Sequence, residues 1–177
     1  AHYLDYFHCN IAVSPKGKWI VNDGWVWHPV GQLMVWDLQK WLQGNVYESE
    51  DGTSQKYLRS IAYYWDTPFC FIDEDTLAVW GYGGDDDWLI NAAVIYSLSS
   101  GKRLRWFAGP QQGDFVFDNH LVVLHKDGTT VWDTKTGERL LIDSEFKPLG
   151  YHPTNHHYLS VTKEGACLLS KLSSYKN

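Results

Sequence analysis

Cysteine is scarce in this sequence, and the three cysteines lie far apart at Cys9, Cys70 and Cys167. Their odd number and the absence of a C-x-x-C pair exclude a disulfide framework and a zinc ribbon as the basis of the fold. We therefore expect free, buried thiols in a reducing compartment, which predicts a cytoplasmic location.

Basic runs and long apolar runs are also lacking. Lys and Arg number 15 against 21 Asp and Glu, which gives a net charge of −6. Nonspecific binding to nucleic acid needs a basic face that displaces counterions, so nucleic acid is not an expected partner. No apolar stretch reaches the length of a membrane span, and the start shows no signal peptide. A membrane is therefore not an expected partner either.

Recognisable catalytic motifs are missing as well. The chain contains neither a G-x-S-x-G nucleophile elbow nor a glycine-rich phosphate loop of the P-loop type. We assign no catalytic residue, no metal ligand and no cofactor from the sequence. Carboxylates are plentiful, however, so a glycosidase-like pair of acids stays open as an alternative.

Aromatic residues, by contrast, are abundant. They make up 16% of the 177 residues, with ten Trp and eleven Tyr, and hydrophobic residues make up 44%. Aromatic side chains cover a pleated surface well, and this composition favours a packed β-sheet protein over a disordered one. The best helical candidate is the short segment Leu38 to Leu42. The composition therefore predicts an all-β domain.

An internal repeat defines the architecture. Four apolar segments each end in a large hydrophobic residue followed by Asp or Ser. We call this large residue the anchor of the repeat, and the four anchors are Trp36, Tyr96, Trp132 and Leu169. The intervals between these anchors are 60, 36 and 37 residues. The last two intervals are close to one repeat length, and the first corresponds to a repeat plus an insertion.

The residues around each anchor complete the repeating unit. Gly101 and Gly137 each follow an anchor by five residues, where glycine permits the positive φ of a tight hairpin turn. Each unit is predicted as strand–turn–strand–loop–strand–turn–strand, which is the four-stranded antiparallel blade of a β-propeller. The expected organisation is one partial propeller domain over 1–177, with approximate blades at 9–48, 69–108, 114–143 and 146–177.

Two of these units resemble WD repeats. The resemblance rests on Ser14 to Lys18 together with Val35-Trp36-Asp37-Leu38, and on Lys126 to Asp133. No Gly-His dipeptide opens a blade, and the second and fourth anchors are followed by serine rather than aspartate. The resemblance implies a propeller whose repeats have diverged and which acts as a scaffold for other proteins.

A second resemblance concerns one blade only. The segment Tyr96 to Trp106 is similar to the Trp-docking repeat of quinoprotein-like propellers. In that family a tryptophan at this position packs against the neighbouring blade. This resemblance implies a ligand-binding or catalytic propeller and is the alternative to the first.

The predicted units are fewer than the resembled family usually has. Tyr3 to Phe7 is predicted as a strand before the first blade, which either belongs to a preceding blade or completes the last one. An open stack of blades exposes an apolar face at each end. We therefore expect either further blades from a longer protein or a dimer that completes a ring.

The partner site is predicted on two long loops, 22–31 and 81–88, and on the link 44–66 between the first two blades. Aromatic side chains beside carboxylates and glycine turns give rigid contact area on a rigid scaffold. The candidate partner-binding residues are Trp25, Trp27, His28, Tyr82, Asp85, Asp86, Asp87 and Trp88. The alternative is that Trp25 and Trp27 pad the first blade and that the three aspartates form a solvated hairpin tip.

Metal sites are weaker candidates. The run Asp85 to Asp87 offers oxygen ligands for calcium, but consecutive residues cannot easily all face one ion. His152, His156 and His157 offer imidazoles for zinc, but they are predicted in a turn on the opposite side from the long loops.

The expected function is therefore that of a non-catalytic WD-repeat-like scaffold, which binds a protein or peptide partner through loops on one face. The alternative is a ligand-binding or catalytic propeller of quinoprotein-like or carbohydrate-active type that uses the same loops.

Overall fold

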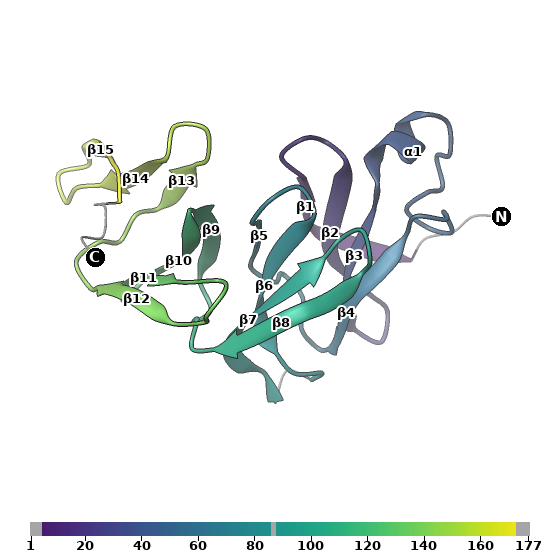
Figure 1. The fold of residues 1–177 in the computed structure, drawn as a ribbon, viewed down its shortest axis with the longest axis horizontal. Coiled ribbons are helices and arrows are strands. Elements are labelled where there is room, and N and C mark those ends of the chain that lie inside the picture. The colour runs from purple at the N-terminus through teal and green to yellow at the C-terminus, as the bar shows by residue number, and fades with distance from the viewer. Residues whose placement is uncertain (1–4, 86–87, 173–177) are drawn as a thin grey trace.

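A computed structural model describes residues 5–85 and 88–172. Four antiparallel sheets stand side by side in an open arc, with the first sheet at one end and the fourth at the other (Figure 1). This is the blade arrangement of a β-propeller, so the predicted all-β propeller class is confirmed. Within the described ranges, no helix is long and apolar enough to cross a membrane.

Strands follow the chain order within each blade, from the inner strand outwards. The first blade contains β1 (Tyr6–Val13), β2 (Trp19–Val26), β3 (Val30–Asp37) and β4 (Lys56–Ala62). The second contains β5 (Phe69–Phe71), β6 (Thr76–Tyr82), β7 (Ile90–Ser97) and β8 (Lys102–Ala108). The third contains β9 (Asp114–Asp118), β10 (His120–His125), β11 (Gly128–Trp132) and β12 (Arg139–Asp143). The fourth contains β13 (Gly150–His152), β14 (His157–Val161) and β15 (Cys167–Ser170).

The first blade departs from its predicted range of 9–48 at both ends. Its outer strand β4 lies at Lys56–Ala62, within the segment predicted to link two blades. The extra residues of the first repeat, 38–55, are inserted between β3 and β4 and begin with the helix α1 (Leu38–Leu42). At the other end, Tyr6 and Phe7 do not precede the blade but open β1, where they pair with Val26 and Trp25.

The first long loop is shorter than predicted. Strand β2 runs to Val26 and β3 begins at Val30, so only residues 27–29 turn the chain. Asn22 and Asp23, which suggest a turn, are buried in β2, where Asn22 Oδ1 lies 3.1 Å from His8 Nδ1. Gly24 also lies in β2, and glycine is required there because a Cβ would lie 2.2 Å from the Phe7 carbonyl oxygen. Tertiary partners thus override the local turn preference.

Apolar cores fill the spaces between successive blades. The first junction joins Val21, Leu33 and Val35 to Leu77 and Val79 of the second blade. The core of the second junction includes Trp80, Ile95, Leu121 and Val123, and that of the third includes Val122, Val131 and Tyr158. Strand β10 alternates between two of these cores, so its whole apolar run is buried, as a blade covered on both faces requires.

The insertion, residues 38–55, covers the face of the first blade that points away from the second. On this face Trp36 and Met34 are buried, and Trp41 meets the Trp36 ring edge-on at a centroid distance of 5.7 Å. Gln55 Nε2 lies 3.6 Å from Met34 Sδ. The buried Glu48 carboxylate holds the insertion together, because it accepts hydrogen bonds from the Ser54 N–H at 2.7 Å and from Asn45 Nδ2 at 2.6 Å.

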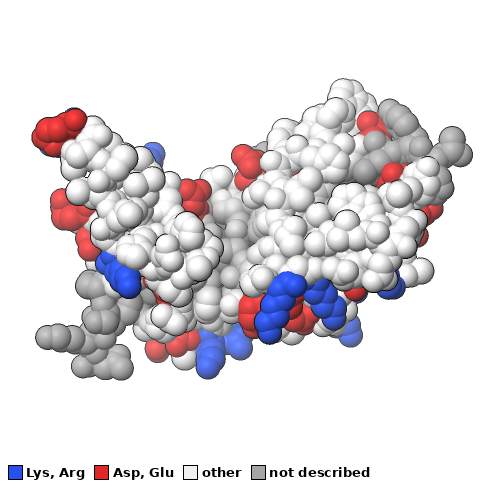
Figure 2. Space-filling model, turned by 90° about the horizontal axis from the view of Figure 1, so that it is seen from above, with Lys and Arg blue, Asp and Glu red and all other residues white. Residues whose placement is uncertain are grey.

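The inner strands β1, β5, β9 and β13 line the concave side of the arc. They enclose a cavity of about 610 Å³ whose lining includes Phe69, Phe71, Phe115 and Phe117. Figure 2, which views the molecule from above, shows a mainly uncharged hollow on this side and Lys and Arg gathered along the lower edge.

Two side-chain predictions are corrected by the structure. Cys9 and Cys167 are exposed and only Cys70 is partly buried, although all three thiols are free. Trp106, which the quinoprotein resemblance places against a neighbouring blade, stacks on Tyr82 of its own blade at a centroid distance of 4.2 Å. Tyr82 on β6 faces the Trp106 ring, so the stacking partner of Trp106 belongs to the same blade.

Candidate functional site

The turn between β2 and β3 meets the link that follows β4. The Tyr63 N–H donates to the Pro29 carbonyl oxygen at 2.9 Å. The link then passes directly over Gly31, where a Cβ would lie 1.6 Å from the Tyr64 carbonyl oxygen. Glycine is therefore required at this crossing, and it fixes the distance between the two segments.

Three residues that are not glycine have left-handed backbone at this crossing. They are His28 at φ 101°, Tyr63 at φ 57° and Asp66 at φ 59°. Such conformations cost free energy for residues with a Cβ, and they persist only where the surrounding structure imposes them. Their grouping in one turn and one link marks this part of the molecule as a candidate site.

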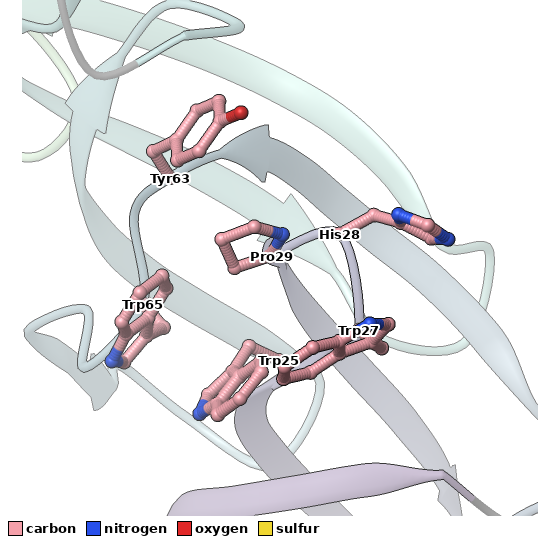
Figure 3. A pocket seen from close by; sticks show the side chains of 6 residues that line it. All are labelled: Trp25, Trp27, His28, Pro29, Tyr63 and Trp65. Atoms are coloured by element: carbon pink, nitrogen blue, oxygen red, sulfur yellow. The ribbon is translucent and has the colours of Figure 1, made fainter.

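An aromatic pocket of about 440 Å³ forms between the turn and the link. Its lining residues are Trp25, Trp27, His28, Pro29, Tyr63 and Trp65. Tyr63 lies across from Trp25 and Trp27, with Pro29 between them and Trp65 at one side (Figure 3). None of the six is acidic, and none is lysine or arginine.

The rings of this pocket support one another. The Trp25 ring lies 5.3 Å from that of Trp65 and 6.1 Å from that of Trp27, measured between centroids. Phe7 stacks on Trp25 at 4.2 Å, which fixes the central indole against β1. Trp27 and Tyr63 nevertheless remain 63% and 62% exposed. The pocket thus combines a fixed aromatic base with two accessible rings.

A buried polar network anchors the link beneath the pocket. Asp23, only 1% exposed, accepts a hydrogen bond from the Thr67 N–H at 2.7 Å. Arg59 donates to Thr67 Oγ1 at 3.1 Å and to the carbonyl oxygens of Trp80 and Gly81 at 2.7 Å each. One carboxylate and one guanidinium therefore tie the link to the first two blades.

Burial shifts the titration of this network. It raises the pKa of Asp23 to about 6, against the opposing effects of the Thr67 N–H and the positive charge of Arg59. Burial likewise lowers the pKa of Arg59 and raises that of Tyr64 to about 12. The link beneath the pocket is thus held by a carboxyl group whose pKa lies well above its ordinary value.

The predicted partner-binding residues separate into two groups. Trp25, Trp27 and His28 line the aromatic pocket. Tyr82 lies at the boundary with the first blade, where the Arg103 guanidinium stands 5.2 Å from its ring. Trp88 is 77% exposed in the loop after β6.

Asp85, the described residue of the predicted acidic run, does not line the aromatic pocket. Asp85 forms a bridge with Ala62, the residue directly before Tyr63. Asp86 and Asp87 lie outside the described residues. Asp85 therefore contacts the end of β4 beside the pocket, and among the described residues of the β6–β7 loop none lines it.

Sequence reasoning missed Pro29, Tyr63 and Trp65. The aromatic run Tyr63-Tyr64-Trp65 is the available signal, although its middle residue Tyr64 packs on the core of the second junction, with its ring 5.6 Å from that of Trp80. Tyr63 and Trp65 lie at the end of the stretch 44–66, which the sequence predicts as one connection, whereas in the structure they directly follow β4.

The histidines proposed as zinc ligands lie in the fourth blade, away from the aromatic pocket. His152 and His157 face each other across the β13–β14 ladder, and His156 Nδ1 lies 2.8 Å from Asp118 Oδ1. In the part of the chain that the structure describes, no group of three or more His, Cys, Asp or Glu is placed to hold a metal ion.

Comparison with known proteins places the fold. The β-propeller domain of the Trilobed protease from Pyrococcus furiosus, described as having an open velcro topology, matches 96% of this chain with a TM-score of 0.51 and 14% identity. The fold is a β-propeller. A crystal structure of a eukaryotic initiation factor matches 99% of the present chain, with a TM-score of 0.49 and 13% identity.

The likeness to the protease propeller shows the fold alone. The chain spans 50% and 44% of the lengths of the two matched chains, about half in each case. No family model matches the sequence. No curated protein matches it either.

Proposed function

We propose that this propeller is a non-catalytic, WD-repeat-like binding module of the cytoplasm, and that a protein or peptide partner occupies the aromatic pocket. The observation that carries the proposal is the exposure of Trp27 and Tyr63 on a base of fixed indole rings. Grouped apolar surface of this kind marks interaction sites, and tryptophan and tyrosine dominate their binding energy. Rigid rings lose little conformational entropy when a partner binds.

Two features support a WD-like module. Asp37, which follows the Trp36 anchor, accepts hydrogen bonds from the N–H groups of Gln39 and Lys40. Asp133, which follows the Trp132 anchor, does the same for Lys135 and Thr136. In both units the aspartate after the tryptophan therefore shapes the chain as it leaves its strand.

The catalytic alternative has less support at this site. Hydrolysis or carbohydrate chemistry needs convergent carboxylates or a nucleophile with its base. The lining of the aromatic pocket instead supplies ring faces, one imidazole and one phenol. Such a lining suits recognition better than group transfer.

A displayed library of random peptides tests the proposal. We expect the wild-type protein to enrich peptides whose affinity falls about thirtyfold or more in Trp27→Ala, because truncation of a central tryptophan typically costs about 2 kcal/mol or more. Leu42→Ala provides a control, since Leu42 is exposed on α1 outside the pocket. Circular dichroism would establish that both variants are folded.

Failure to enrich any peptide would contradict the proposed function. So would peptides that bind wild type and Trp27→Ala with equal affinity, because the partner site would then lie elsewhere on the propeller.

A further inference from the structure

The polar side-chain atoms of the aromatic pocket are mainly hydrogen-bond donors. Trp25, Trp27 and Trp65 each carry one indole N–H and no acceptor, and the Tyr63 hydroxyl can donate as well. Figure 3 shows the indole nitrogens of Trp25 and Trp65 pointing the same way, while that of Trp27 lies towards His28. A well-matched ligand therefore offers acceptors around an apolar body.

The lining also discriminates by charge. None of its six residues is Asp, Glu, Lys or Arg, so an anion would lose hydration without gaining a counter-charge, and a cation would gain the attraction of the ring faces alone. A sugar presents many hydroxyl groups that donate as well as accept, whereas the only side-chain acceptors of the lining are the His28 imidazole and the Tyr63 hydroxyl oxygen. Neutral ligands that have few donors fit best.

An ordinary extended peptide fits less well than a proline-rich one. Its backbone N–H groups would meet ring faces and indole N–H groups, and each donor left unpaired in a contact costs free energy. Proline has no N–H, keeps its carbonyl acceptor, and presents a flat apolar ring that packs on aromatic faces. Its chain also enters polyproline II without a large entropy loss.

We propose that the aromatic pocket binds a proline-rich segment in the polyproline II conformation, an inference that rests on the proposed peptide-binding function. Pyrrolidine rings pack between Tyr63 and the indoles of Trp25 and Trp27, against Pro29. Segment carbonyl oxygens accept hydrogen bonds from the indole N–H groups. The left-handed backbone at His28 and Tyr63 fixes the distance between the β2–β3 turn and the link after β4 before the ligand binds.

Isothermal titration calorimetry with a synthetic oligoproline peptide tests this inference. We expect oligoproline to bind, whereas a Gly-Ser peptide of equal length, a cello-oligosaccharide and tetramethylammonium do not. Trp27→Ala is expected to weaken oligoproline binding about thirtyfold or more. Trp27→Phe keeps an aromatic ring and removes one donor, so it should weaken binding about fivefold, the value of one neutral hydrogen bond.

Tyr57→Ala is the matched control. Tyr57 is an exposed aromatic residue on β4 and does not line the pocket, so its removal should leave the affinity for oligoproline within about twofold. Near-ultraviolet circular dichroism verifies the packing of each variant, and Trp27→Phe keeps the test decisive if Trp27→Ala is poorly folded.

The outcomes separate the two proposals. Equal binding of oligoproline and the Gly-Ser peptide, or no oligoproline binding, overturns the ligand class. If the random library yields Trp27-dependent peptides without proline, the peptide-binding function stands and the proline-rich ligand is wrong. Binding of the sugar or of tetramethylammonium through Trp27, without any peptide binding, overturns both.

Discussion

At the scale of single residues, Asp23 connects the first blade to the link that lines the aromatic pocket. Its side chain is buried in β2, yet it supports a link that belongs to the next blade connection and carries Trp65. The N–H groups of Thr67 and Asp66 and the nearby charge of Arg59 replace only part of the hydration that the charged carboxylate loses. Its ionisation therefore opposes folding.

The variant Asp23→Asn should expose this effect in the pH dependence of stability. The folded pKa is raised from 3.8 to about 6, so the folded state holds the proton more tightly than the unfolded chain. The stability due to this group is full below about pH 4 and is lost as the pH rises through about 6. Relative to Asp23→Asn, the wild-type free energy of unfolding should fall by up to about 3 kcal/mol between these values.

Chemical denaturation at several pH values measures this difference. Asparagine keeps an oxygen that accepts from the Thr67 N–H, and every other titrating group is common to both proteins. Parallel stability curves for the two proteins would show that Asp23 titrates as it does in the unfolded chain.

At the scale of elements, the repeat pattern predicts the blades because its anchors perform one packing task. Trp36, Tyr96 and Trp132 are all buried, whereas the fourth anchor, Leu169, is 70% exposed. Leu169 lies on the face of the last described blade that no further blade covers. The repeat period therefore identifies the anchor position in each blade. Whether the anchor is buried depends on an adjacent blade, which the sequence around the anchor does not reveal.

The site could be predicted only in part for a related reason. Trp25, Trp27 and His28 stand out in the sequence as an aromatic cluster beside a turn. Tyr63 and Trp65 reach this cluster because β3 pairs with β4. The insertion separates these two strands in the sequence, so their pairing cannot be recognised from the repeat pattern. A repeat interrupted within a blade has the same length as one interrupted between blades, so spacing alone cannot distinguish the two.

The insertion should depend on its buried carboxylate. Burial alone would raise the pKa of Glu48, but hydrogen bonds from Ser54 and Asn45 lower it below its ordinary value. Glu48→Ala leaves the buried Ser54 N–H without its acceptor and loosens the cover over Trp36. We expect a loss of about 1–3 kcal/mol in the free energy of unfolding and faster proteolysis within 38–55.

Val46→Ala serves as the control for this prediction, because Val46 is exposed in the same segment. Equal stability and equal cleavage rates for the two variants would show that Glu48 does not hold the insertion in place.

At the scale of the whole molecule, the two ends of the arc are unlike. The insertion covers the outward face of the first blade, whereas the fourth blade exposes Leu159, Val161 and Leu169 on its outward face. For a second copy to complete a ring, its fourth blade would have to displace the insertion. The ring of two copies and the longer propeller both stay proposals, and the ring of two copies additionally requires the insertion to move.

Hydrogen exchange should reveal a gradient along the arc. Among the described residues, the buried apolar side chains number ten at the first junction, eight at the second and four at the third. We expect amides of β14 to exchange at least about tenfold faster than those of β2 and β6, equivalent to about 1.4 kcal/mol in local opening. Uniform protection across all four blades would contradict this expectation.

Because the arc is open, its blades are expected to unfold in a fixed order. In a stack where each blade contacts only its neighbours, cooperativity passes from junction to junction, and the blade with the smallest junction separates first. Denaturation would then proceed from the fourth blade towards the first, in steps rather than as a single transition. The aromatic pocket lies beside the largest junction, so a partly denatured molecule would keep its binding capacity after its last blade has melted.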